Sequence, residues 1–382
     1  MNIGIDIRTL MDAQYSGVSE YTYNLVKEIL KLDQHNQYKL FYNSYKDISA
    51  RIPDFRQENV EIVHSNYPNK IYNYLMHKIM HYPKVDQQFG FNLFFMPHIN
   101  FISLTSGCNS ILTIHDLSFL RYKEYFSLRK NIWHQFINIK KLVKKFNLII
   151  AVSESTKNDL VELCNINPEK IRVIYSGISE QFRKIVINDI KLLEVKKKYN
   201  LPEKFIFYLS TLEPRKNVES IIQAYNELRN KNKNLADMKL VLAGAKGWKA
   251  NNIFKIWEQS KYQEDIIFLG YVKGDDKVYF YNLASLFVYP SFYEGFGFPP
   301  LEAMACGTPV VTSSVSSLPE VVGDSAIMVD PYNINDIATA MEQVLTNQDL
   351  ANLLIKKSLE QARQFSWQKS AREYLEVFKS FD

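Results

Sequence analysis

Short runs of apolar residues recur along the whole chain, and this pattern limits the possible folds more than any other feature of the sequence. The runs are continuously apolar rather than alternating, which is typical of strands covered on both faces, as in parallel sheets. Such strands usually alternate with helices. The predicted strands span residues 2–7, 37–43, 60–65, 92–97, 110–116, 148–153 and 171–177 in the first half, and 205–211, 239–244, 266–272, 286–291, 308–313 and 326–330 in the second.

Segments with helical spacing separate these runs. Apolar residues of 18–32 recur every three or four positions after Gly17, and those of 218–228 do so after Asn217, which we expect to cap a helix. Strand–helix alternation that occurs twice predicts an α/β fold with two doubly wound, Rossmann-like domains. Because open parallel sheets bind ligands at the carboxyl ends of their strands, we expect the domains to face each other across a cleft.

Composition and cysteine use suggest a cytoplasmic protein. No apolar run approaches the ~18 residues of a membrane span. Residues 1–10 lack the basic region and long apolar region of an export signal. Cys108, Cys164 and Cys306 are far apart and lack metal-binding spacing, which favours a reducing compartment over a disulfide framework.

Positive charge is concentrated in the first half of the chain. Residues 1–185 carry 23 Lys+Arg and 17 Asp+Glu, a net charge of +6, and the remainder carries 23 and 24, a net charge of −1, which together give +5. This imbalance favours an anionic partner for the first half. Nucleic acid usually requires a denser basic patch, so we predict no nucleic-acid binding.

Two glutamates, Glu294 and Glu302, flank a glycine- and proline-rich loop in SFYEGFGFPPLEAMACG, residues 291–307. Both carboxylates can accept hydrogen bonds from sugar hydroxyls, and we place Glu302 in the first turn of a helix. Alternatively, Glu302 only complements the helix dipole and Glu294 is a solvated loop residue. The pair of glutamates together with the two glycines favours a binding site.

The loop itself has the features of an anion site. Pro299 and Pro300 suit the start of a helix, and Gly307 suits its C-terminal cap. Gly295 and Gly297 let backbone N–H groups approach a ligand closely at the helix N-terminus.

Two further segments carry candidate ligand-binding residues. Arg215 and Lys216 follow the strand at 205–211, and two cations beside a helix N-terminus repel its dipole unless an anion joins them. Alternatively, both are solvated loop cations. His115 lies at the end of the strand at 110–116, where a ligand-binding residue belongs, although a lone histidine there is more often structural.

The stretch PSFYEGFGFPPLEAMACGTPVV, residues 290–311, resembles the Glu-x7-Glu signature of the retaining glycosyltransferases of family 4. The resemblance is strong over residues 205–331 and patchy before residue 180. It implies the B-type fold of two Rossmann domains. It also implies that Glu294 contacts the sugar of a nucleotide-sugar donor, that Glu302 contacts the ribose, and that Lys216 and the loop amides bind the diphosphate.

The same resemblance implies that His115 contacts the donor sugar. Many family members also carry an arginine about six residues before the lysine; here Ser210 or Thr211 stands at that position, and Arg215 is the candidate replacement. We predict Glu294, His115 and Lys216 as catalytic residues. The predicted substrate-binding residues are Gly17, Ser210, Arg215, Lys216, Tyr271, Gly295, Phe296, Gly297, Phe298 and Glu302.

Residues 1–185 are assigned to an N-terminal acceptor-binding domain and residues 186–364 to a C-terminal nucleotide-sugar-binding domain. The lysine-rich stretch 180–203 is the predicted linker. The resemblance implies that a C-terminal helix within 365–382 crosses back to the N-terminal domain.

These expectations describe a glycosyltransferase without a cofactor. We expect it to be metal-independent, since no obvious Asp-x-Asp metal-binding pair is present. The family resemblance implies that it retains the anomeric configuration. We favour mannose or a deoxyhexose from a GDP donor over a UDP donor. The expected acceptor is a saccharide or a lipid-linked acceptor in polysaccharide or glycoconjugate synthesis. Two alternatives stay open: a nucleotide-sugar epimerase of the same fold, and a non-catalytic two-domain sugar-binding protein.

Residues 125–153 contain six Lys and Arg residues but no Asp or Glu. Trp133 lies beside these cations, and a basic helix with a flanking tryptophan suits peripheral contact with an anionic membrane, here its inner face. Alternatively, the segment is a core helix with a solvated charged face. In either case we expect the following residues, repeated at helical spacing, to face the domain core: Leu128, Ile132, Phe136, Ile139 and Val143.

Overall fold

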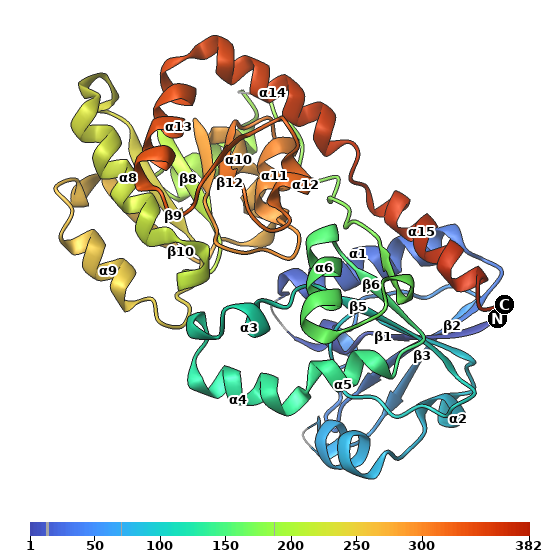
Figure 1. Cartoon of the computed structure of the whole chain (residues 1–382). Helices are drawn as coiled ribbons and strands as arrows, with labels where there is room; N and C mark the ends of the chain where they lie inside the picture. The colour runs from blue at the N-terminus through green and yellow to red at the C-terminus, as the bar shows by residue number, and fades with distance from the viewer. Residues whose placement is uncertain (13–14, 70, 187) are drawn as a thin grey trace. The chain divides into compact units, whose positions relative to one another are not determined.

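The computed structural model describes residues 1–12, 15–69, 71–186 and 188–382, and the chain forms two compact units (Figure 1). The first unit comprises residues 1–117, 131–177 and 366–382, and the second comprises 118–130 and 178–365. This division differs from the predicted boundary at 185/186, because the chain changes unit at 177/178. It also assigns residues 118–130 to the second unit, where their aromatic side chains stack on that unit's own rings.

The first unit is built on a seven-stranded, fully parallel sheet with the order β3-β2-β1-β4-β5-β6-β7. Ile3 on the interior strand β1 lies opposite Tyr38 on β2 and Leu93 on β4. The strands are β1 (Asn2–Asp6), β2 (Gln37–Asn43), β3 (Val60–Ser65), β4 (Leu93–Met96), β5 (Asn109–Ile114), β6 (Leu148–Ala151) and β7 (Ile171–Val173). The helices are η1 (Arg8–Met11), α1 (Gly17–Leu32), η2 (Ser49–Arg51), η3 (Ile71–Met80), α2 (Val85–Phe89), α4 (Leu128–Ile137, of which residues 131–137 belong to this unit), α5 (Ile139–Lys144), α6 (Glu154–Cys164), η5 (Pro168–Lys170) and α15 (Trp367–Lys379).

The C-terminal helix α15 belongs to the first unit and packs on α1. The hydroxyl of Tyr374 on α15 lies 2.7 Å from the hydroxyl of Tyr21 on α1 and 2.7 Å from Thr113 Oγ1 on β5. Gly177 allows the chain to pass this helix closely, because a Cβ at that position would lie 2.0 Å from the backbone N of Trp367. These buried contacts fix α15 against the first sheet.

The second unit contains a six-stranded parallel sheet with the order β10-β9-β8-β11-β12-β13 and helices on both faces (Figure 1). Its strands are β8 (Phe205–Leu209), β9 (Lys239–Ala243), β10 (Ile266–Gly270), β11 (Leu286–Tyr289), β12 (Val310–Ser313) and β13 (Ile327–Val329). Its helices are α3 (Ser118–Arg121), η4 (Lys123–Tyr125), α7 (Ile190–Lys198), η6 (Pro214–Lys216), α8 (Val218–Lys231), η7 (Lys233–Leu235), α9 (Asn251–Glu258), η8 (Gln263–Asp265), η9 (Gly274–Asp276), α10 (Lys277–Leu283), α11 (Phe298–Ala305), α12 (Leu318–Val322), α13 (Ile334–Thr346) and α14 (Gln348–Ala362). Each predicted apolar run overlaps one of the observed strands, and β5 begins one residue before its predicted run, so the predicted α/β class with two parallel sheets is confirmed.

The stretch 180–203 is more than a linker. Asp189 caps α7 by accepting hydrogen bonds from the backbone N–H groups of Lys191 and Leu192. Leu192 and Val195 are buried, and α7 packs against α10. The many lysines of α7 suggested a solvated connection, but one face of the helix belongs to the core of the second unit.

The predicted continuous core stripe over 128–143 is wrong in its first half. Leu128, Ile132 and Phe136 on α4 are exposed, whereas Ile139 and Val143 on α5 are buried as predicted. Asn138 explains the difference: it adopts a left-handed conformation with φ 50°, and its side chain caps α5 by accepting from Lys141 N. The turn at Asn138 separates the two helices, so the stripe does not continue. No helix in the described part of the chain has the length and apolarity that a bilayer span requires.

Candidate active site

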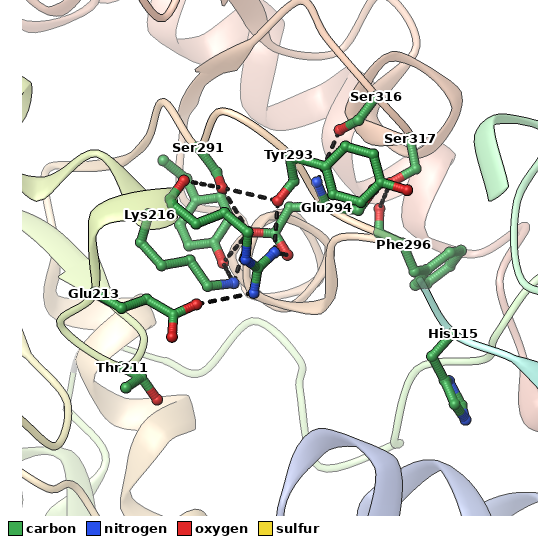
Figure 2. Close-up of polar contacts among 12 residues, drawn as sticks. His115, Thr211, Glu213, Lys216, Ser291, Tyr293, Glu294, Phe296, Ser316 and Ser317 are labelled. Carbon is green, nitrogen blue, oxygen red and sulfur yellow. Dashed lines mark hydrogen bonds and ion pairs between the residues drawn. The ribbon is translucent and has the colours of Figure 1, made fainter. Parts of the chain in front are cut away.

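The candidate site begins where two neighbouring strands of the second sheet end. Strand β8 leads into η6, which carries Arg215 and Lys216, and the adjacent strand β11 leads into the loop with Glu294. Parallel neighbours place their carboxyl ends at the same edge of a sheet, so these two segments meet there. Figure 2 shows Lys216 and Glu294 with their charged groups pointing toward each other.

Glu294 is held by three side chains at one of its oxygens. Its Oε1 lies 2.6 Å from Lys216 Nζ, 2.9 Å from the Tyr289 hydroxyl and 2.7 Å from Ser291 Oγ. The side chain is buried, which by itself would raise the pKa of the carboxyl group, but the charges of Lys216 and Arg215 outweigh burial and lower that pKa to about 2. Glu294 is therefore ionised at neutral pH.

Arg215 connects Glu294 to a second carboxylate. Its NH1 lies 3.2 Å from Glu294 Oε2 and 2.6 Å from the carbonyl oxygen of Tyr293, and its NH2 lies 3.0 Å from Glu213 Oε1. Burial is the largest influence on Glu213 and raises the pKa of its carboxyl group, although Arg215 and Lys216 partly offset it. We call Glu213, Arg215, Lys216 and Glu294 the charge quartet; its formal charges sum to zero when all four residues are ionised.

Two serines hold the backbone of the loop that follows Glu294. The N–H of Glu294 donates to Ser316 Oγ at 2.9 Å, and Ser317 Oγ lies 2.7 Å from the carbonyl oxygen of Phe296. Gly297 has φ 119°, and a Cβ there would lie 2.8 Å from a methyl carbon of Leu318. The predicted need for glycine at position 297 is thus explained by backbone conformation and by packing on α12.

Helix α11 begins at Phe298, with proline in its first turn, and is followed by Gly307 with φ 74°, so its predicted start and end are confirmed. Glu302 lies in the second turn, not in the first as predicted, because the helix begins one residue before the prolines. Glu302 is buried, and its Oε2 accepts a hydrogen bond from the Tyr281 hydroxyl at 2.7 Å. Phe296 and Phe298 pack edge to face, with ring centroids 5.2 Å apart.

Ser210 and Tyr271, the other predicted residues of this unit, follow β8 and β10. Ser210 lies against Gly244, where a Cβ would come within 1.8 Å of the Ser210 carbonyl oxygen. Tyr271 is an exposed side chain next to Gly270. Neither side chain belongs to the charge quartet.

Asn217 does not cap α8 with its side chain, contrary to our expectation. It has φ 57° at the N-cap position, and its Nδ2 donates to the carbonyl oxygens of Pro290, at 3.0 Å, and Pro331, at 2.7 Å. Asn217 thereby ties η6 to the loops after β11 and β13. Asn217 remains the N-cap residue of α8 by its backbone, while its side chain anchors the residue next to Lys216.

Residues 118–130 line the second unit beside this site through aromatic side chains. Tyr125 stacks on Phe292 with centroids 5.6 Å apart, and Phe292 packs on Tyr332 at 4.7 Å. Trp248 Nε1 donates to the carbonyl oxygen of Tyr125 at 2.6 Å, and Lys130 Nζ lies 3.2 Å from the centre of the Trp248 ring. Because Phe292 directly precedes the Tyr293–Glu294 pair, this aromatic cluster supports the loop that carries Glu294.

His115 and Gly17, the predicted residues of the first unit, are not part of the charge quartet. His115 follows β5, and its Nε2 lies 2.8 Å from the carbonyl oxygen of Pro97, which can only accept a hydrogen bond. Burial is the main cause that lowers the pKa of His115, so the ring is neutral and Nδ1 is its acceptor. Gly17 is the first residue of α1, and a Cβ there would meet no atom within 4 Å, so packing does not explain this glycine.

Sequence reasoning missed several residues of the site. Glu213 was not singled out in the sequence, and Tyr289 and Ser291 were only part of the predicted strand at 286–291. The available signal was position, since Tyr289 is the last residue of β11 and Glu213 and Ser291 follow the carboxyl ends of β8 and β11, close to a predicted cation or carboxylate. Among the described residues, no group of three or more His, Cys, Asp and Glu side chains is placed to hold a metal ion.

Comparisons with protein families match both units of the chain. The family described as glycosyl transferases group 1 matches residues 189–361, and the family described as Glycosyltransferase Family 4 matches residues 15–182. The O-antigen chain mannosyltransferase B of Escherichia coli is 33% identical over 271 residues, which cover 71% of this chain and 70% of that protein. The serotype-specific mannosyltransferase WbdA of Escherichia coli is 33% identical over 270 residues, but the match covers only 33% of its length.

Solved structures agree at the level of the fold. Sucrose-phosphate synthase from Thermosynechococcus elongatus has a TM-score of 0.75 at 19% identity, covering 100% of this chain and 98% of that chain. Anabaena Alr3699/HepE, solved in complex with UDP and glucose, has a TM-score of 0.72 at 17% identity, covering 100% of both chains. Together with the two parallel-sheet units and the family matches, these likenesses show that the chain belongs to the glycosyltransferases of group 1 and family 4 and has their B-type fold.

Proposed function

We propose that this glycosyltransferase is a metal-independent, retaining enzyme that transfers mannose or a deoxyhexose from a GDP donor to a saccharide or lipid-linked acceptor in polysaccharide synthesis. The observation that carries the proposal is the charge quartet at the adjoining ends of β8 and β11. The names of the two relatives, an O-antigen chain mannosyltransferase and a serotype-specific mannosyltransferase, support the choice of sugar, and the first name supports the pathway class. A cytoplasmic location is part of the proposal and agrees with three free, buried cysteines.

Donor binding in this proposal exchanges partners within the charge quartet. Lys216 and Arg215 hold carboxylates now, and the diphosphate of a nucleotide sugar, with one negative charge on each phosphate, offers them charged acceptors in place of these carboxylates. When Lys216 turns to the diphosphate, Glu294 Oε1 loses its shortest contact and is left to accept from a hydroxyl of the donor sugar. Tyr289 and Ser291 keep Glu294 in place during this exchange.

The transfer step follows from the same charges. The bond between the anomeric carbon and the diphosphate oxygen breaks, and Lys216 and Arg215 stabilise the negative charge that develops on the leaving group. Glu294 is a weak nucleophile because its pKa is lowered to about 2 and its oxygens are held by several donors. The acceptor oxygen therefore attacks from the face of the leaving group, which retains the configuration, and its proton passes to the departing phosphate oxygen. The contact of His115 with the donor sugar stays a prediction of the family resemblance.

Thermal-shift measurements with GDP, UDP, their sugar derivatives and free nucleosides test the donor assignment. A ligand at 100 times its Kd adds ~2.7 kcal/mol of stability. Lys216→Met should abolish the thermal shift caused by nucleoside diphosphates but keep the shift caused by nucleosides. Lys231 is an exposed lysine at the end of α8, and Lys231→Met should change neither thermal shift.

Product analysis separates the proposal from its alternatives. Transfer with retention should continue in excess EDTA, and NMR of the product should show the anomeric configuration of the donor. Activity that disappears with EDTA and returns with Mg²⁺ contradicts the metal-independent mechanism. Conversion of the donor without an acceptor indicates an epimerase, and binding without turnover indicates a sugar-binding protein.

A further inference from the structure

Large apolar side chains are exposed together on two helices of the first unit. They are Tyr74, Ile79 and Met80 on η3 or its end, and Ile132, Trp133 and Phe136 on α4, each between 37% and 59% exposed. We call these six side chains the η3–α4 face. Apolar residues scattered singly on a surface need no explanation, but contiguous ones mark interaction sites.

Specific contacts hold the two helices together. The rings of Tyr74 and Phe136 have centroids 4.5 Å apart. Lys78 Nζ lies 3.2 Å from the centre of the Phe136 ring and donates a hydrogen bond to the Phe136 carbonyl oxygen. Burial of Lys78 against these rings lowers the pKa of its amine. These contacts at Phe136 join two segments more than fifty positions apart in the sequence, so the exposed apolar side chains of the η3–α4 face lie on neighbouring helices.

A basic helix continues directly from this face. Lys140, Lys141, Lys144 and Lys145 on α5 and its end are exposed, while Ile139 and Val143 of the same helix are buried in the first unit. No Asp or Glu occurs between residues 125 and 153. The lysine charges thus face solvent next to an aromatic and aliphatic surface, without acidic residues in their own segment.

We propose that the η3–α4 face docks on the surface of a bilayer that contains anionic lipid, with the four lysines of α5 bound to the headgroups. Trp and Tyr side chains favour the boundary between headgroups and acyl chains, where Trp133 and Tyr74 would sit. Lysines near such a surface add electrostatic attraction that decreases with salt. The proposal deepens the proposed function, since a bilayer is where a lipid-linked acceptor resides, but it rests on the surface and not on the transfer reaction.

Vesicle co-sedimentation tests the docking. The protein should bind vesicles of phosphatidylcholine and phosphatidylglycerol in equal amounts at low salt, bind them much less at high salt, and leave pure phosphatidylcholine vesicles largely unbound. Changing Lys140, Lys141, Lys144 and Lys145 all to Gln should weaken binding at least ~10-fold. The matched control changes four exposed lysines elsewhere, Lys191, Lys197, Lys356 and Lys369, to Gln and has the same net charge.

Tryptophan fluorescence tests the apolar part of the face. Trp133 is exposed, so its emission should shift to the blue on vesicle binding, and brominated lipid should quench it. Trp133→Phe should remove most of the shift while binding persists, and Trp133→Ser should weaken binding. Leu353→Ser removes a similarly exposed apolar side chain of α14 and should bind as the unchanged protein does.

Three outcomes overturn the proposal. The first is absence of binding to the anionic vesicles at low salt. The second is an equal loss of binding in the two lysine variants, which would show a response to net charge alone. The third is a dimer in light scattering that Trp133→Ser disperses, because the face would then cover a second copy of the chain. Transfer to a water-soluble acceptor should be unchanged in the four-lysine variant, so failure of docking is distinguishable from failure of the proposed function.

Discussion

An arginine–carboxylate pair lies at the carboxyl end of the first strand of each sheet, and the two pairs differ in burial and in what surrounds them. Arg8 and Asp6 are both buried, whereas Arg215 is only partly buried. After β1, Arg8 contacts both oxygens of Asp6, with Nε 2.9 and 3.0 Å away and NH2 2.5 Å from Oδ2. After β8, Arg215 contacts Glu213 at 3.0 Å and Glu294 at 3.2 Å. Both pairs lie at the carboxyl ends of parallel strands, where ligands usually bind.

The partners show why one pair is structural and the other is proposed to be functional. Arg8 uses its remaining donors on Asn73 Oδ1 at 2.6 Å and the carbonyl oxygen of Phe101 at 3.0 Å, which joins β1 to η3 and to the loop after β4. Arg215 contacts two carboxylates, Glu213 and Glu294, and Lys216 contacts Glu294 as well, so a diphosphate has two cations to join and two carboxylates to displace. One-to-one pairing fixes a fold, whereas shared pairing can be rearranged by a ligand.

The largest expected effect concerns the first pair. Asp6→Asn should destabilise the protein by about 3–5 kcal/mol, because it leaves Arg8 charged and buried without its counter-ion. Nucleotide affinity of the folded protein should not change. Urea unfolding and calorimetric titration measure the two quantities. Asp54→Asn is a matched control: Asp54 and Arg56 have the same spacing and a 2.8 Å contact but are exposed, so stability should hardly change. Weakened nucleotide binding in a folded Asp6→Asn variant contradicts the comparison.

The pH dependence of stability should also distinguish the two clusters. His98 Nε2 lies 3.8 Å from Asp6 Oδ2, and burial, as the main cause, lowers the pKa of His98 from 6.5 to about 4. The unfolded chain therefore binds a proton in this range and the folded chain does not. Stability is complete above pH 6.5 and falls by up to about 3 kcal/mol as the pH decreases to 4. Glu294, with its pKa of about 2, should lose its contribution only below about pH 4.5.

Urea unfolding across this range, with hydrogen exchange of peptides from each sheet, measures the difference. Strands β1 and β4 should lose protection before β8 and β11. His98→Gln should flatten the pH dependence of the free energy of unfolding between pH 6.5 and 4. His35 lies on the loop after α1, and His35→Gln should leave this pH dependence unchanged. An unchanged slope in His98→Gln would falsify the assignment to His98.

The next effect concerns catalysis at the second cluster. Glu294→Gln keeps the size of the side chain but removes the negative charge that we propose stabilises the donor sugar in the transition state. The value of kcat should therefore fall ~100-fold or more. Nucleotide affinity should change far less. Steady-state kinetics and titration calorimetry separate the two, and Glu360→Gln, an exposed residue of α14, is the control. Near-normal turnover in a folded Glu294→Gln variant removes Glu294 from the reaction.

The strands that carry both clusters could be predicted from the sequence, because continuously apolar runs are typical of buried parallel strands. The loop motif with Glu294 and Gly297 was accessible too, since its glycines and prolines restrict the backbone directly. The pairing of Lys216 with Glu294 could not be predicted from the sequence, because it depends on β8 and β11 being neighbours in the sheet. Glu213 was missed because burial, which raises its pKa, comes from chain segments distant in sequence.

The exposed α4 shows a different limit of sequence reasoning. Its apolar residues repeat at helical spacing, and such spacing shows that one face is apolar but not what covers it. Leu128, Ile132 and Phe136 were predicted to be core residues, and the turn at Asn138 directs them to solvent. Periodicity therefore predicted the helix but not its environment.

The smallest predicted effect is an increase in affinity, and it tests the charge balance of the quartet. Glu213→Gln leaves Arg215 an acceptor but removes one negative charge, so the quartet becomes net positive before a diphosphate arrives. At an effective dielectric constant of about 20, one unit charge roughly 8–16 Å away is worth about 1–2 kcal/mol, so nucleoside diphosphates should bind roughly 5- to 30-fold tighter. Free nucleosides carry no diphosphate and should bind unchanged. Glu258→Gln, at the exposed end of α9, gives the same change in net charge and should leave both affinities as they are. If Glu213→Gln instead weakens diphosphate binding, Glu213 serves to hold Arg215 in place, as Asp6 holds Arg8, and the two clusters are alike.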